Sequence, residues 1–135
     1  MGFEWAEFLA LAEYLRACND PQVNTEAAQR SAVSRAYYAV FCIARNFAEQ
    51  YESFQRLNDG EDHSRLQRHF ENWKRSDVAN GLFALRRWRN QADYDDDVQN
   101  LPMLVNESVK RAKSLKLRLE GAAVREYGAP PPDKK

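Results

Sequence analysis

Arg89 and Asp93 stand one helical turn apart in a segment that is apolar along one side. When this segment is projected as a helix at about 100° per residue, Arg89 falls between Val78 and Leu82, inside the apolar arc. Arginine carries a permanent charge on a planar fork that matches the oxygens of a phosphate. One interpretation is therefore a cation held at a cleft or subunit seam to bind phosphate. The other is a structural ion pair with Asp93, in which the arginine stem covers the core.

Tyr94 and Asp93 are the nearest side chains that could exchange a proton at such a site. A phenol has a pKa of about 10, so it is a poor general acid or base at neutral pH unless that pKa is strongly shifted. In an unbroken helix, a five-residue step turns Tyr94 about 140° away from Arg89. The two side chains can meet on one ligand only if the helix unwinds after Asp93 or if two subunits come together. The alternative role for Tyr94 is to pack at the helix junction with its hydroxyl bonded locally.

The two histidines and the two cysteines do not form a metal-ligand pattern. His63 and His69 point about 120° apart on one helix, and Cys18 and Cys42 have no ligand-like spacing. The sequence also contains no glycine-rich phosphate loop and no nucleophile motif. We therefore expect neither a metal nor a cofactor.

Basic residues gather in two further places. Residues 86–89 combine three arginines with Trp88, but Trp88 belongs to the apolar stripe and is expected in the core rather than as a base-stacking platform. The last predicted helix is also basic, which indicates either a solvated face or a set of phosphate contacts. Its basic residues are Lys110, Arg111, Lys113, Lys116 and Arg118.

The elements that must hold these residues are all predicted to be helices. Their apolar residues recur at helical spacing, and Asn19-Asp20-Pro21, Asn58-Asp59-Gly60 and the acidic residues 95–97 separate them. Thr25 and Ser76 are predicted N-caps, and Gly128 is the predicted stop. The predicted helices span about residues 3–18, 25–51 and 63–73, then a segment from Ser76 to the acidic residues 95–97, and a last one from Leu101 that Gly128 closes. We expect an all-α fold, an antiparallel bundle of about four main helices plus a short extra helix.

The second predicted helix has apolar or small residues well beyond one face, from Val33 through Tyr51. Such a helix is either central in the bundle or packs against a second subunit. Arg35 and Tyr38 project away from its main stripe, so they are either solvated or line a dimer seam beside Arg89.

Size and charge limit the possible classes of protein. A chain of 135 residues fits one domain, which we place at residues 1–127, with residues 128–135 as a disordered tail. Its 20 basic residues balance 20 acidic ones, so any nucleic-acid partner must be held by a local patch. The acidic N-terminal stretch favours neither a signal peptide nor a membrane span. With both thiols expected to be buried, we predict a cytoplasmic protein that binds no membrane.

Two segments resemble the HEPN superfamily (higher eukaryotes and prokaryotes nucleotide-binding), especially its small, uncharacterised bacterial branch. They are residues 34–41, SRAYYAVF, and residues 85–95, LRRWRNQADYD. His63, at the start of the short helix, occurs between them as it does in the family. The resemblance extends over residues 25–119.

The resemblance implies a helical bundle that often dimerises. The superfamily contains metal-independent ribonucleases, toxins paired with small nucleotidyltransferase antitoxins, and non-catalytic members. Its ribonucleases use an arginine followed four to six residues later by a histidine. Arg89-Asn90 matches the start of that motif, but Tyr94 stands where the histidine belongs. The ligand-site or dimer-seam candidates are then Arg35, Tyr38, Arg86, Arg89, Asn90 and Tyr94.

These features favour a protein that is not an enzyme. The leading hypothesis is a homodimeric module that binds a nucleotide or RNA, or that partners a small nucleotidyltransferase in a toxin–antitoxin-type pair, with a degenerate ribonuclease motif. The second is an active metal-independent ribonuclease in which Arg89 stabilises phosphate charge and Tyr94, Asp93 or a histidine from elsewhere handles protons. The third is a helical scaffold that binds only protein.

Overall fold

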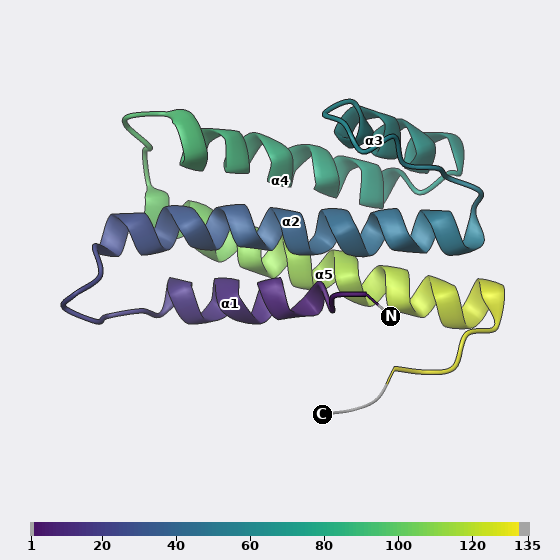
Figure 1. Cartoon of the computed structure of the whole chain (residues 1–135), viewed down its shortest axis with the longest axis horizontal. Coiled ribbons are helices and arrows are strands. Elements are labelled where there is room, and N and C mark those ends of the chain that lie inside the picture. The colour runs from purple at the N-terminus through teal and green to yellow at the C-terminus, as the bar shows by residue number, and fades with distance from the viewer. Residues whose placement is uncertain (1, 133–135) are drawn as a thin grey trace.

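The computed structural model describes residues 2–132, and in this part of the chain it contains five helices. Four of the rods lie side by side and consecutive ones point in opposite directions, while α3, which is as short as the first helix, lies beside the first half of α4 (Figure 1). The predicted all-α bundle is confirmed. The helices are α1 (Ala6–Arg16), α2 (Thr25–Tyr51), α3 (Asp62–Asn72), α4 (Ser76–Tyr94) and α5 (Leu101–Tyr127).

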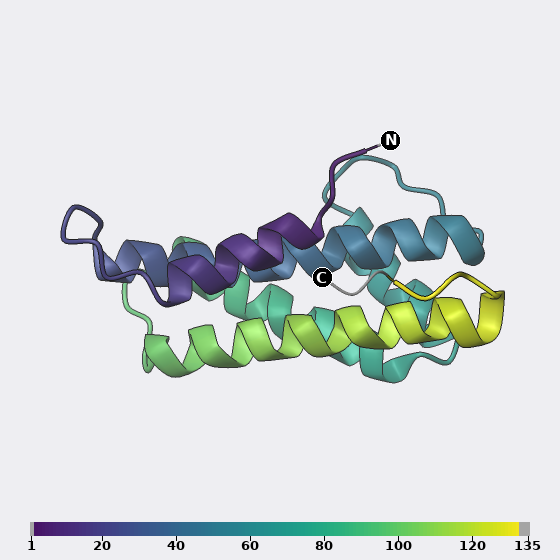
Figure 2. The ribbon, with the colours of Figure 1, turned by 90° about the horizontal axis from the view of Figure 1, so that it is seen from below.

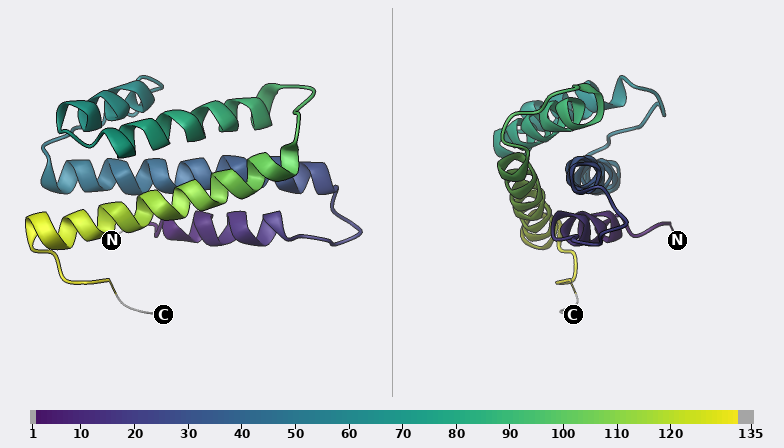
Figure 3. Two further views of the ribbon diagram at one scale, coloured as in Figure 1. Left: turned by 180° about the vertical axis from the view of Figure 1, so that it is seen from behind. Right: turned by 90° about the vertical axis from the view of Figure 1, so that its left-hand side faces the viewer.

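Helix α2 is the centre of the bundle, because it packs against α1, α4 and α5. Seen end-on, α4 and α5 form an arc along one side of α2, and α1 lies beneath it (Figure 3). Its buried positions run from Ala28 to Ala48 and include many alanines, whose small side chains let neighbouring helices approach closely. The wide apolar arc predicted for this segment is therefore explained within one chain.

The helix boundaries agree with the predictions to within a few residues, but two predicted caps are wrong. Asn24, not Thr25, caps α2: its side chain accepts a hydrogen bond from the backbone N–H of Ala27 at 2.8 Å, while Thr25 is already helical. Ser76 is likewise the first residue of α4, and Arg75 occupies the cap position. Gly128 ends α5 with φ of 69°, a left-handed conformation that glycine adopts without strain.

Arg30 holds the junction between α4 and α5. Its guanidinium donates hydrogen bonds to the carbonyl oxygens of Ala92, Asp95 and Asp96 at 3.0, 2.6 and 3.0 Å. Carbonyls in the last turn of a helix have no partner within the helix, so the bond to Ala92 satisfies a group that α4 leaves open, while the bonds to Asp95 and Asp96 hold the turn that follows. This explains why the helix ends firmly after Tyr94, with Asp95 in an extended conformation.

A buried polar cluster closes the other end of the bundle around Glu52, whose side chain is fully buried. Its carboxylate accepts hydrogen bonds from Arg75 at 2.8 Å and from the Tyr127 hydroxyl at 2.7 Å, and it lies 3.0 Å from Nε2 of His69. Arg75 also pairs with Glu126, which is half exposed. The cluster joins α2, α3, the start of α4 and the end of α5.

Of the predicted tail, residues 128–132 follow α5 without regular secondary structure, and residues 133–135 lie outside the described part of the chain. None of the helices within residues 2–132 is both long enough and apolar enough to cross a membrane.

Candidate functional site

The two segments that resemble the HEPN superfamily come together at the junction of α2, α3 and α4. The guanidinium of Arg89 lies over two tyrosine rings of α2, 5.5 Å from the centre of Tyr37 and 5.3 Å from that of Tyr38. The imidazole of His63 stacks on Phe41 with ring centres 4.4 Å apart, and its Nδ1 bonds the Tyr37 hydroxyl. Arg89 of α4 and His63 of α3 thus both pack against Tyr37 of α2.

Arg89 is 8% exposed, and its guanidinium is only loosely paired. Its Nη1 lies 3.7 Å from Oδ2 of Asp93, which is too long for a hydrogen bond. The same Asp93 oxygen accepts a hydrogen bond from the Ser34 hydroxyl at 3.3 Å. The predicted ion pair therefore exists, but Asp93 is shared and does not saturate the arginine.

Two buried arginine nitrogens at this site have no hydrogen-bond partner within the described residues. They are Nε of Arg86 and Nε of Arg89. A buried donor left without a partner costs roughly 1–3 kcal/mol. Because neither nitrogen is bonded, either side chain can turn toward a ligand without breaking a hydrogen bond at that atom.

Burial and the two arginines keep His63 uncharged. Desolvation, followed by the positive charges of Arg86 and Arg89, lowers the pKa of His63 to about 4. Burial also raises the pKa of Tyr37, so its phenol keeps its proton at neutral pH. When Tyr37 donates this proton to Nδ1, the proton of the imidazole itself lies on Nε2. The charge of the site at neutral pH therefore comes from the arginines and Asp93.

The low pKa of His63 predicts a pH-dependent loss of stability. The pKa is about 6.5 in the unfolded chain and about 4 in the fold, so between these values the unfolded chain binds more protons. This contribution to stability is present above pH 6.5 and is lost as the pH falls toward 4. We expect the urea midpoint, followed by circular dichroism, to fall less between pH 7 and pH 4.5 in His63→Gln than in the wild type. Equal losses in both proteins would contradict a strongly lowered pKa.

The α2 candidates lie beside Arg89 in the same chain. Tyr38 is half-buried, and a second guanidinium, that of Arg35, lies 5.5 Å from its ring centre. Arg35 also covers the ring of Phe8 from α1 at 4.8 Å. Neither side chain is simply solvated, and Tyr38 links Arg35 to Arg89.

Tyr94 does not join this group. It is 75% exposed and is the last residue of α4, and the helix remains intact past Asp93. Tyr94 therefore points away from Arg89 within one chain, and the alternative that it packs at the helix junction is also wrong. The junction is instead held by Arg30, which bonds the carbonyls there. Asn90 is likewise exposed on the outer side of α4.

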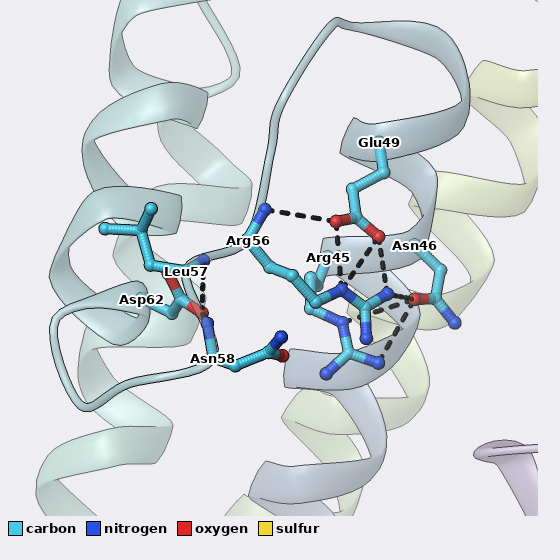
Figure 4. A network of polar contacts seen from close by, with 7 residues as sticks. All are labelled: Arg45, Asn46, Glu49, Arg56, Leu57, Asn58 and Asp62. Carbon is cyan, nitrogen blue, oxygen red and sulfur yellow. Dashed lines mark hydrogen bonds and ion pairs between the residues drawn. The ribbon is translucent and has the colours of Figure 1, made fainter.

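His63 and Tyr37 were not among the site candidates drawn from the sequence. A polar network fixes the loop before α3, the helix that carries His63 (Figure 4). The side chain of Asp62 accepts hydrogen bonds from the backbone N–H groups of Leu57 and Asn58, both at 2.9 Å. Arg56 ties the same loop back to α2 through Glu49 at 2.9 Å. The place of His63 in the resemblance was the signal that could have identified it.

Trp88 lies where the apolar stripe predicts, half-buried and packed against the core, with Arg111 over its ring at 5.8 Å. Within residues 2–132, no three His, Cys, Asp or Glu side chains gather as they would around a metal ion. Comparison of the chain with protein-family models, curated proteins and solved structures gives no match.

Proposed function

We propose that this chain is a HEPN-like protein that binds a phosphate group of a nucleotide or of RNA between Arg86 and Arg89 and does not cleave it. One observation carries the proposal: the Nε atoms of these neighbouring arginines are buried without a hydrogen-bond partner among the described residues. Arginine forks bind phosphate oxygens in pairs, and such charge-assisted bonds are about twice as strong as neutral ones. A bound phosphate would supply hydrogen-bond acceptors for these two nitrogen atoms.

The surroundings of Arg89 favour an anion. Asp93 offsets part of the positive charge, but its contact of 3.7 Å is loose and Ser34 offers it a second partner. His63 is neutral and adds no positive charge of its own at neutral pH. A phosphate would thus meet two fixed cations and one carboxylate that is already bonded elsewhere.

The same groups are poorly suited to proton transfer. The ribonuclease motif of the family has its histidine where this chain has Tyr94, which is exposed on the far side of α4. His63 is present, but a pKa of about 4 makes it a weak base at neutral pH. Because Tyr94 points away and His63 is a weak base, these groups support binding of a phosphate rather than its cleavage.

The family resemblance adds the expected partners. We infer a homodimer that acts beside a small nucleotidyltransferase, as in toxin–antitoxin-type pairs of the superfamily. Co-expression with any small nucleotidyltransferase encoded next to this chain, followed by co-purification, tests the nucleotidyltransferase partner. Light scattering of the pure chain tests the homodimer.

A ribonuclease remains the second candidate, because His63 and Arg89 both contact Tyr37. The two functions separate when a fluorescent RNA is incubated with the protein in a chelator. We expect the RNA to be bound and to stay intact. Cleavage that disappears in both Arg89→Ala and His63→Ala, but persists in Arg87→Ala, would establish the nuclease instead. Failure to bind any RNA or nucleotide would leave only a protein-binding scaffold.

A further inference from the structure

A second basic surface lies on α5, which spans the length of the bundle along one edge (Figure 2). An open groove runs along its exposed side and is closed at one point by the end of α1. None of its residues belongs to the Arg86 and Arg89 site. It is lined by Arg16, Asn106, Val109, Lys110, Lys113, Ser114, Leu117, Arg118 and Arg125.

The charged side chains that line this groove are all basic. Five lining side chains are basic and none is acidic. Lys113 and Arg118 pair at the rim with Glu13 and Asp77, whereas Arg16, Lys110 and Arg125 make no ion pair within residues 2–132. In a chain with 20 basic and 20 acidic residues, this is a marked local excess of positive charge.

The position of Arg125 depends on a glycine one turn earlier. A Cβ at Gly121 would come within 2.7 Å of Nη1 of Arg125, so the guanidinium lies in the space that a side chain would fill. The guanidinium thus lies close to the backbone of α5, although Arg125 is exposed. In this position Arg125 lines the groove.

We infer that this groove binds the phosphate backbone of double-stranded RNA. From Lys110 to Arg125, α5 rises about 22 Å, which is long enough to meet several phosphates. Asn106 and Ser114 add neutral groups of the kind that contact phosphate and sugar. No aromatic side chain lines the groove, so it offers no platform for stacking the bases of a single strand. The choice of RNA over DNA rests on the proposed function.

Other occupants fit this surface less well. A membrane-surface helix needs a free apolar face, but the apolar face of α5 is used by the core. Protein interfaces are anchored by aromatic and apolar side chains, and here Leu117 is the one strongly exposed apolar residue. A second copy could offer its acidic turn, residues 95–97, and this is the main competitor.

The test uses the full chain and a fluorescent RNA duplex of about 20 base pairs, with anisotropy measured from 50 to 200 mM KCl. The slope of log K against log salt is negative, and each lost phosphate contact reduces its magnitude by about 0.9. For Arg16→Gln/Lys110→Gln/Arg125→Gln we expect a magnitude smaller by about two to three and affinity at least tenfold weaker. A control with the same loss of charge, Arg68→Gln/Lys74→Gln/Arg87→Gln, changes exposed residues of α3, α4 and the turn between them. It should bind like the wild type.

The remaining outcomes test the groove, the choice of RNA and the separation from the Arg86 and Arg89 site. If the groove variant binds RNA like the control, or if it differs from wild type only in oligomeric state, the groove does not bind RNA. If a DNA duplex of the same sequence binds equally well, the assignment to RNA is wrong. Arg86→Gln/Arg89→Gln should retain duplex binding through the groove. If it alone abolishes binding, the groove proposal fails while the proposed function stands. Circular dichroism melts verify that all variants fold.

Discussion

Replacing Arg75 by alanine is expected to lower the free energy of unfolding by about 3–5 kcal/mol, the usual cost of leaving one member of a buried ion pair alone. The carboxylate of Glu52 is fully buried, and Arg75 donates to it at 2.9 and 2.8 Å. Without the arginine, that charge keeps only His69 and the hydroxyl of Tyr127. The urea midpoint and slope, measured at pH 7, give the free energy directly.

Two further variants separate lost charge pairing from lost contacts. Glu126→Gln removes the exposed partner of the same arginine and should cost at most about 1 kcal/mol, as exposed pairs do. Glu52→Leu/Arg75→Met removes both buried charges and should recover most of the stability that Arg75→Ala loses. A double variant as unstable as Arg75→Ala would mean that the ion pair is not the cause.

Replacing Arg89 by glutamine is expected to weaken the binding of a nucleotide or RNA by roughly 10- to 150-fold, which corresponds to about 1.5–3 kcal/mol for hydrogen bonds to a charged group. Glutamine keeps hydrogen-bonding groups but loses the charge and the fork. Arg86→Gln should act in the same direction, because its Nε is also unpaired within the described residues. Isothermal titration calorimetry with a nucleotide and anisotropy with a single-stranded RNA measure the loss.

Arg87 provides the matched control for this prediction. It is exposed on the same helix and covers Phe83 at 6.0 Å on the outer side. Arg87→Gln makes the same chemical change two residues away and should reduce binding less than twofold. Equal losses in Arg87→Gln and Arg89→Gln would indicate a general effect of charge, and the site would then not lie where we propose.

The fold could be predicted because its signals are local. Helical periodicity and turn residues lie within a few positions of one another, so the five helices could be expected with nearly the observed bounds. The cap of α2 was assigned one residue too late, because Asn24 and Thr25 are both good caps and only the backbone shows which of them is helical. Helix ends are generally uncertain by such amounts.

The site could be predicted only where its signal was also local. Arg89 was identifiable from its place in the apolar arc of its own helix. Arg30, which bonds carbonyls more than sixty residues away, and Glu52, which meets Tyr127, form contacts that no periodicity encodes. His63 and Tyr37 meet across 26 positions for the same reason. Packing at the helix junction was wrongly offered as a role for Tyr94, because hydrogen bonds from Arg30, which is far away in the sequence, hold that junction instead.

The side-chain resonances of arginine test the central claim most directly. In ¹H–¹⁵N spectra of the labelled protein, the Nε–H signals of Arg86, Arg87 and Arg89 can be assigned by single substitutions. On titration with a nucleotide, we predict that the Arg86 and Arg89 signals shift and saturate together while that of Arg87 stays in place. Saturable binding that leaves both the Arg86 and the Arg89 signals unmoved would contradict a phosphate site at these arginines.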